Sequence, residues 1–81
     1  MFYVYLLISL DKYKHSYVGY TDSLKKRLKL HNSGKGAKFT RGRQWKMVYS
    51  KSYLSKSQAI KEEFKLKKNY KLRKEIKKKF I

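Results

Sequence analysis

The alternation of hydrophobic and polar residues predicts three short strands. Residues 2–9 (FYVYLLIS) are aliphatic, aromatic and β-branched and are too few for a helix, which is typical of a buried strand. A polar turn over residues 10–16 separates them from a second strand at 17–20 (YVGY), so the two form a hairpin. Residues 45–53 (WKMVYSKSY) alternate as a third strand. Period-two alternation assigns Tyr5 to one face of the first strand and Leu6 to the other.

Three helices follow from N-cap signals and from the spacing of apolar residues. Residues 24–32 (LKKRLKLHN) come directly after three N-cap candidates at 21–23. Ser55 and Gln58 form a capping box that begins a second helix. Asn69 can cap a third helix, in which apolar residues recur every four positions. The order of elements is therefore β-β-α-β-α-α.

The predicted fold class is α/β: a small antiparallel or mixed three-stranded sheet with flanking helices. A chain of 81 residues is long enough for one domain with a thin core. We expect a single domain over residues 1–81, with its core at about 2–68. Residues 69–81 are expected to form a basic C-terminal helix or tail.

Glu63 lies among apolar positions of the helix that begins after Ser55. A turn of 100° per residue gives one arc that contains Ala59, Ile60, Glu63, Phe64, Leu66 and Lys67. A carboxylate that faces an apolar stripe is costly to desolvate unless it meets a cation or a metal ion. Glu63 is therefore either a metal ligand or the partner of a lysine in a salt bridge.

The charge balance changes the expected class of partner. The chain has 23 Lys and Arg residues against 5 Asp and Glu residues, a net charge of +18. Such a surplus suits a polyanion, and nucleic acid is the usual one, small ribosomal proteins included. An anionic membrane is the competing partner, but it favours one coherent basic amphipathic helix, whereas these cations spread over the whole chain.

Other compositional features limit the location and the chemistry. There is no cysteine, which excludes disulfides and cysteine-based zinc sites. The apolar residues 1–10 lack a positive n-region and a small-residue cleavage site, so we interpret them as a strand rather than a signal peptide. No stretch approaches a transmembrane length. We therefore expect an intracellular protein, in the cytoplasm or nucleoid, without a membrane partner.

Five residues with the chemistry of phosphodiester hydrolysis converge in this fold. Tyr5 and Tyr17 lie on adjacent strands, and Arg27 and His31 are four residues apart on the inward edge of the first helix. Glu63 points inward from the second helix. A glycine-spaced basic loop at residues 33–44 flanks them, and its cations are Lys35, Lys38, Arg41 and Arg43.

The residue types fit the requirements of the reaction. A carboxylate can hold a hard divalent cation, and a guanidinium can neutralise phosphate oxygens in a fork geometry. A base must take a proton from water. His31 could do so directly, and a tyrosine could do so only if cations such as Arg27 lowered its pKa from its usual value of about 10.

In order along the chain, these residues resemble the GIY-YIG nuclease family. Tyr3-Val4-Tyr5 stands at the GIY triplet and Tyr17-Val18-Gly19 at the YIG triplet. The family's helical arginine matches Arg27, and its metal-binding glutamate matches Glu63. The resemblance covers about residues 2–68, and HNSGKGAKFTRGR further resembles the small single-domain, UPF0213-like branch.

The chain is also similar to the nuclease domain of the eukaryotic structure-specific endonuclease subunit that resolves branched DNA. Two positions depart from the family pattern. Tyr3 replaces the glycine of the first triplet, and Phe39 stands where many relatives have tyrosine. The first change removes no catalytic group, whereas the second removes a hydroxyl.

The resemblance implies a metal-dependent DNA endonuclease that uses one Mg²⁺ or Mn²⁺ ion, with specificity for DNA structure as a further expectation. Glu63 would hold the metal and Arg27 would clamp the scissile phosphate. Tyr5 or Tyr17 would orient or deprotonate the water, with His31 as proton acceptor or as the base itself. The loop cations Lys35, Lys38, Arg41 and Arg43 would hold the flanking backbone.

A second hypothesis is a non-catalytic nucleic-acid-binding module on the same scaffold. A lone domain lacks the specificity module of larger family members, so cleavage could be weak or depend on a protein partner. RNA is a second candidate ligand. DNA repair or recombination is one candidate setting, and mobile-element defence or a ribosome-linked role would leave the same residues.

Overall fold

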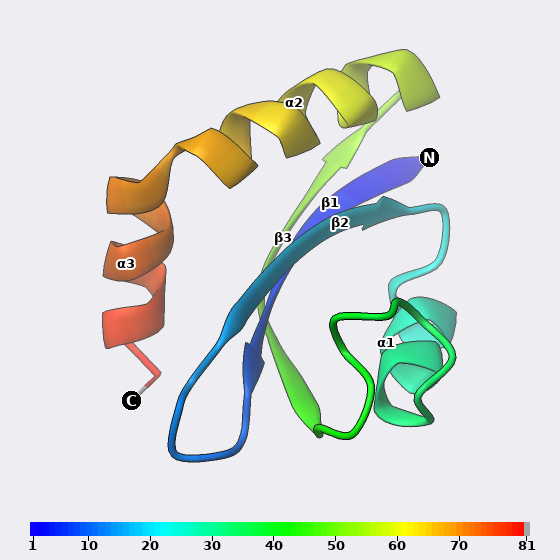
Figure 1. Cartoon of the computed structure of the whole chain (residues 1–81). Helices are drawn as coiled ribbons and strands as arrows, with labels where there is room; N and C mark the ends of the chain where they lie inside the picture. The colour runs from blue at the N-terminus through cyan, green and yellow to red at the C-terminus, as the bar shows by residue number, and fades with distance from the viewer. Residues whose placement is uncertain (81) are drawn as a thin grey trace.

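A three-stranded antiparallel sheet forms the middle of the molecule (Figure 1). The computed structural model describes residues 1–80. Strand β1 (Phe2–Ser9) lies in the centre, between β2 (Ser16–Thr21) and β3 (Trp45–Tyr53). Both neighbours run antiparallel to β1, and a bulge interrupts the β1–β3 register between Leu6 and Leu7. The predicted order and strands are confirmed, with β2 one residue longer at each end than predicted.

Three helices cover the sheet, and each begins at a capping residue that the sequence predicts. Helix α1 (Leu24–Asn32) follows Ser23, whose hydroxyl accepts the Lys26 N–H. Helix α2 (Lys56–Lys68) follows Ser55, whose hydroxyl accepts the Gln58 N–H at 3.1 Å. Helix α3 (Tyr70–Lys78) follows Asn69, which both ends α2 and accepts the Leu72 N–H. The C-terminal segment is thus helical up to Lys78.

The helices lie on opposite faces of the sheet (Figure 1). On one face, Val4 and Leu6 pack with Ala59 and Leu66 of α2 and with Ile76 of α3. On the other face, the apolar cluster is built around β1 and β3 and is covered by α1. Its members are Tyr5, Leu7, Trp45, Tyr17, Leu24, Leu28 and Met47. The predicted alternation of β1 is confirmed.

The predicted apolar arc of α2 is wrong in part. Ala59 and Leu66 are buried as expected, whereas Ile60 and Phe64 are exposed. The helix meets the sheet through positions 59, 63 and 66, so the next positions around the helix turn toward solvent. The aliphatic stem of Lys68 brings its ammonium 4.4 Å from the centre of the Phe64 ring, which gives that exposed ring a cationic partner. None of the helices within residues 1–80 has the length and apolarity needed to cross a bilayer.

Candidate active site

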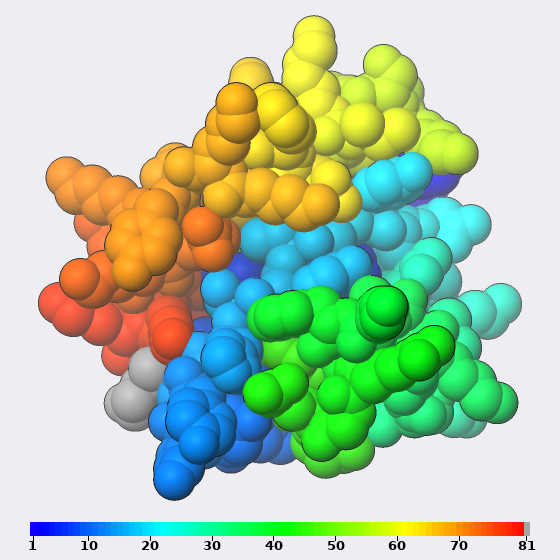
Figure 2. All heavy atoms as spheres, viewed as in Figure 1, coloured from blue at the N-terminus to red at the C-terminus, as the bar shows by residue number. Residues whose placement is uncertain are grey.

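A cleft of about 430 Å³ opens at the edge of the sheet formed by β2. Figure 2 faces this edge, where β2 (light blue) lies between α2 (yellow) and the green loop that follows α1. The cleft is lined by Phe2, Tyr5, Tyr17, Gly19, Tyr20, Thr21, Asp22, Arg27, Lys56 and Glu63. Four of the five predicted catalytic residues therefore share one cleft, and they come from four different elements.

Gly19 allows Tyr5 to reach this cleft. Tyr5 lies opposite Gly19 in the β1–β2 register, and its ring passes directly over the glycine. A Cβ atom at position 19 would lie 2.6 Å from Tyr5 Cζ and closer still to the hydroxyl oxygen. A glycine inside a strand is usually unfavourable, but here it leaves room for a side chain from the neighbouring strand.

His31 lies behind Tyr5 instead of lining the cleft. Its side chain is almost fully buried, at 1% exposure. Nε2 lies 2.8 Å from the Tyr5 hydroxyl, and Nδ1 lies 2.9 Å from Thr40 Oγ1. The Thr40 hydroxyl donates its own proton to the Ala37 carbonyl at 3.0 Å, so it accepts from His31 Nδ1–H. This pattern assigns the proton of neutral His31 to Nδ1, and Nε2 then accepts the Tyr5 proton.

Burial controls the protonation of this pair. Burial raises the pKa of Tyr5 well above 10, and the nearby Tyr17 and Glu63 add to the rise while Arg27 opposes it. Burial and the positive charge of Arg27 lower the pKa of His31 below 6.5. The expected effect of Arg27 on Tyr5 has the predicted sign, but burial outweighs it. Tyr5 is thus a neutral donor to a neutral imidazole at pH 7.

Glu63 forms a salt bridge with a lysine, as one interpretation of its position predicts, and it also lines the cleft. Its side chain is 17% exposed and lines the cleft, and its Oε1 lies 3.5 Å from Lys67 Nζ one turn along α2. Arg27 is half-buried on the opposite wall, and no carboxylate within residues 1–80 forms an ion pair with it. A guanidinium in that state remains available to an anionic ligand.

The cleft suits a cation that keeps most of its water ligands. Within residues 1–80 there is no cluster of three or more His, Cys, Asp or Glu side chains that could enclose a metal ion. Glu63 and Asp22 are the two carboxylates that line the cleft. Mg²⁺ is commonly bound by one or two carboxylates together with substrate phosphates, so this donor set fits such an ion.

Contacts with two aromatic rings, those of His31 and Phe39, fix the position of the Tyr17 ring. Its ring lies edge-on to His31, with centroids 5.0 Å apart, and stacks on Phe39 at 6.3 Å with an interplanar angle of 19°. Phe39 comes from the loop between α1 and β3 and is itself 51% exposed. Phe39 therefore supplies a ring face on which Tyr17 stacks, and this contact does not need the hydroxyl that a tyrosine at position 39 would add.

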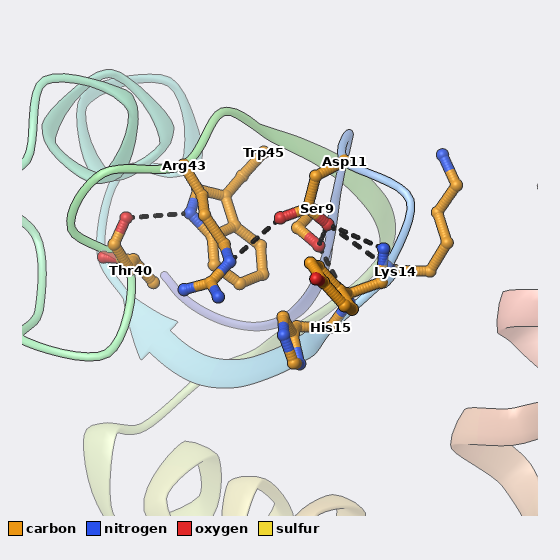
Figure 3. Close-up of polar contacts among 8 residues, drawn as sticks. Ser9, Asp11, Lys14, His15, Thr40, Arg43 and Trp45 are labelled. Atoms are coloured by element: carbon orange, nitrogen blue, oxygen red, sulfur yellow. Dashed lines mark hydrogen bonds and ion pairs between the residues drawn. The ribbon is translucent and has the colours of Figure 1, made fainter.

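Asp11 ties the turn after β1 to this loop (Figure 3). One carboxylate oxygen accepts the Ser9 hydroxyl at 2.8 Å, and the other accepts Arg43 Nε at 3.0 Å. These hydrogen bonds, that of Ser9 foremost, lower the pKa of Asp11. On the loop, the Trp45 indole N–H donates to the Thr40 carbonyl at 3.0 Å. Arg43 therefore has an internal partner, whereas the other predicted loop cations, Lys35, Lys38 and Arg41, are exposed.

Three residues of the site escape the sequence-based prediction. Lys56 and Asp22 line the cleft, and Thr40 orients His31. Asp22 is itself one of the three N-cap candidates at 21–23, and Lys56 follows the predicted N-cap Ser55. These signals could have placed both residues at helix N-termini beside the cleft. Nothing in the sequence pattern marks Thr40, because its contact depends on the path of the loop.

Comparison with known proteins identifies related sequences. Residues 1–77 match the family described as the GIY-YIG catalytic domain. A UPF0213 protein of Oceanobacillus iheyensis is 46% identical over 66 residues, which cover 80% of this chain and 74% of that protein. A UPF0213 protein of Clostridium perfringens is 45% identical over 69 residues, which cover 84% and 72%.

A solved structure has the same architecture. The solution NMR structure of a UPF0213 protein from Bacillus halodurans is 40% identical in sequence, with a TM-score of 0.53. The match covers 93% of this chain and 80% of that one. These findings confirm the predicted resemblance to the small UPF0213-like branch, whereas the similarity to the eukaryotic endonuclease subunit stays a prediction.

Proposed function

The chain belongs to the GIY-YIG catalytic domain family and has its nuclease-type fold, and from this premise we propose that it is a DNA endonuclease. The observation that carries the proposal is the cleft at the β2 edge. It combines Tyr5, Tyr17, Arg27 and Glu63, which are far apart in the sequence and chemically suited to phosphodiester hydrolysis. The family implies a nucleic-acid substrate, and DNA inside the cell is the substrate we propose.

Glu63 is the proposed ligand of one Mg²⁺ or Mn²⁺ ion. Such an ion supplies charge stabilisation to the phosphate and to the leaving oxygen when it is bound. Lys67 pairs with Oε1 of Glu63 and therefore competes with an ion for that oxygen. The two side chains are one turn apart on α2, and ion pairs of this kind contribute only about 0.3–0.5 kcal/mol. Lys67 is therefore a weak competitor.

Arg27 is the proposed clamp on the scissile phosphate. Its guanidinium lines the cleft opposite Glu63 and can donate two parallel hydrogen bonds to phosphate oxygens. The same charge stabilises the additional negative charge that develops at phosphorus in the transition state. Lys56, at the start of α2, adds a second cation to the cleft wall.

Tyr5 and His31 provide the proposed proton path. The Tyr5 hydroxyl donates to His31 Nε2, so its oxygen lone pairs are free to accept a hydrogen bond from water. As the water oxygen bonds to phosphorus and the bond to the leaving oxygen breaks, the water proton passes to the Tyr5 oxygen and the Tyr5 proton passes to Nε2. The leaving oxygen takes a proton from solvent and departs as the alcohol. Tyr17 orients the same water. His31 then carries the positive charge, and Thr40 Oγ1 still accepts from its Nδ1–H.

The exposed cations of the loop, Lys35, Lys38 and Arg41, are proposed to hold the flanking backbone. Such contacts are sequence-independent and weaken with salt. Because Asp11 holds Arg43 Nε, we assign Arg43 mainly to positioning the loop. Its terminal guanidinium nitrogens can still add a backbone contact.

The test is cleavage of a labelled panel of duplex, single strand, 5′ flap and four-way junction with Mg²⁺ or Mn²⁺. Glu63→Gln and Arg27→Ala should each abolish product, whereas Lys25→Ala, on the exposed face of α1, should cut like the wild type. If the Glu63→Gln variant forms as much product as the wild type, the assignment of Glu63 as the metal ligand is contradicted. Absence of product from every form, with DNA binding retained, would indicate the non-catalytic binding module instead.

A further inference from the structure

Helix α3 carries far more positive charge than its own stability requires. Residues 70–78 contain five cations and one acid, Glu75. Basic residues in a last turn, here Lys77 and Lys78, favour a helix through its dipole. That effect fades beyond the last turn and does not explain the remaining three cations, which are Lys71, Arg73 and Lys74.

Four of these cations surround a groove of about 270 Å³ between α3 and the start of β2. The groove is lined by Ser16, Tyr70, Arg73, Lys74, Lys77 and Lys78, with no acidic residue among them. Positive charges that converge on one hollow repel one another unless an anion occupies it. The groove is therefore chemically suited to a phosphate group.

Arg73 is fixed in position at the base of this groove. One terminal nitrogen donates to Ser16 Oγ at 3.2 Å, the other to the Lys67 carbonyl at 2.9 Å, and the guanidinium lies 5.6 Å from the centre of the Tyr70 ring. Its Nε is buried and has no hydrogen-bond partner within residues 1–80. The second proton of each terminal nitrogen remains available, so the guanidinium can also donate to a phosphate oxygen in the groove.

The groove and the active-site cleft lie along the same edge strand. Ser16 begins β2 and borders the groove, whereas Gly19 and Thr21, further along β2, border the cleft. Figure 2 shows α3 (orange to red) beside the start of β2 (blue) on the face that also contains the cleft. The cleft is bordered by β2 residues from Tyr17 to Thr21, so it begins one residue from Ser16. A strand rises about 3.3 Å per residue, so the cleft extends to roughly 16 Å from Ser16, or about five nucleotides of B-form DNA.

We propose that the α3 groove is a second phosphate-binding site, which holds the nucleic-acid backbone a few nucleotides from the phosphate in the cleft. This inference rests on the proposed function only in taking the ligand to be a nucleic acid. Arg73 supplies the fixed contact, and Lys74, Lys77 and Lys78 neutralise the adjoining phosphates. A substrate that spans both sites is aligned with the β2 edge.

The test compares two double variants that each lose two exposed lysines. Lys74→Gln/Lys78→Gln removes charge from the groove, and Lys68→Gln/Lys71→Gln removes equal charge from positions outside it. Binding to a duplex long enough to cover both sites is measured by fluorescence anisotropy with a chelator present, over a salt series from about 50 to about 200 mM. The chelator prevents turnover, so the result does not depend on cleavage.

In the groove variant, the slope of log affinity against log salt should become shallower by about 1 for each phosphate that the protein no longer neutralises. The control variant should keep the wild-type slope. Equal changes in both variants would overturn the proposal, because charge alone would then account for them. If the wild type cuts DNA and the groove variant keeps the wild-type slope of log affinity against log salt, this inference is overturned and the nuclease proposal stands.

A second measurement reports on Arg73 directly. In a ¹⁵N-labelled wild-type protein, the Arg73 Nε–H resonance should shift when the duplex is added, and the amides of α3 should shift with it. Response to inorganic phosphate but not to the duplex would identify a site for free anions and overturn the proposal. Loss of binding to anionic phosphatidylserine vesicles by the groove variant, with unchanged DNA binding, would assign the groove to a membrane and overturn it as well.

Discussion

Two glycines make room for the tyrosine–histidine pair of the cleft. Gly19 lies under the Tyr5 ring, and Gly36 lies against His31, where a Cβ atom would be 2.7 Å from the imidazole Cγ and 2.8 Å from the His31 backbone nitrogen. The Tyr5 and His31 side chains therefore occupy space that a methyl group at position 19 or 36 would fill. This close packing keeps the Tyr5 hydroxyl and His31 Nε2 at 2.8 Å, within hydrogen-bond distance.

Gly19→Ala tests this steric argument. The added methyl group must displace Tyr5, so we expect a loss of about 1–3 kcal/mol in the free energy of unfolding, as is typical of overpacking. Cleavage should fall while DNA affinity changes little. Urea unfolding, cleavage and anisotropy measure the three effects, with Ser50→Ala at an exposed position of β3 as the control. Unchanged stability and cleavage in Gly19→Ala would contradict the assigned packing.

His31 should make stability depend on pH. Its pKa in the folded protein lies below 6.5, mainly because it is buried, so the unfolded chain binds a proton in a range where the folded chain does not. The contribution of His31 to the free energy of unfolding should therefore be constant above pH 6.5. It should decrease as the pH drops from 6.5 to the pKa of folded His31, and level off below that pKa. Cleavage should show an acid limb in the same range, because protonated His31 cannot accept the Tyr5 proton.

Urea midpoints at a series of pH values on either side of 6.5 measure this effect. His31→Gln should remove that part of the decline, whereas His15→Gln removes an imidazole without touching the Tyr5–His31 hydrogen bond and serves as the control. A decline of the same size in His31→Gln would assign it to other groups.

Among the elements, the strands and helix caps were predictable and the face of α2 was not. Strand bounds follow from local composition, and caps follow from single residues such as Ser55 and Asn69, whose hydrogen bonds are local. The buried side of α2 depends on where the sheet lies, which periodicity does not encode. Glu63 was placed correctly because positions 59 and 66 flank it, whereas Phe64 was misplaced because it is apolar.

Leu66→Ala and Phe64→Ala test which face of α2 is buried. Leu66 is 6% exposed and Phe64 is 57% exposed. Leu66→Ala should lower the free energy of unfolding by about 2–5 kcal/mol, because it removes buried apolar surface and leaves a cavity. Phe64→Ala, although it removes more atoms, should change it by no more than about 0.5 kcal/mol. Urea denaturation followed by tryptophan fluorescence measures both, and a larger loss in Phe64→Ala would contradict the assigned face.

At the scale of the loop, the site could be predicted only in outline. The pattern of α1 indicates that Arg27 and His31 face inward, but it does not reveal that His31 is deeper than Arg27. That difference arises from Thr40 and Gly36, which the loop brings against the imidazole. Because the loop has no periodic signal, its contacts could not be predicted from sequence alone.

For the whole molecule, the charge of +18 should give salt opposite effects on folding and on binding. Added salt screens the repulsion among the cations, so the melting temperature should rise as salt increases. The same addition should weaken DNA binding, because the release of counterions from DNA is less favourable at high salt. Melting curves and anisotropy over one common salt series measure the two trends. A melting temperature that falls with salt would show that the three ion pairs found within residues 1–80 outweigh the repulsion.

The central position of β1 determines the order in which the molecule can assemble. Its pairing with β2 joins Ile8 to Ser16 across a short turn, whereas its pairing with β3 joins Ser9 to Trp45 and Phe2 to Tyr53. Short hairpins close within microseconds, and longer loops close at a greater entropic cost. We therefore expect the hairpin to form before β1 pairs with β3, with α2 docking on the completed sheet. In that order the cleft gains Glu63 last, so the proposed nuclease site is incomplete until α2 has docked.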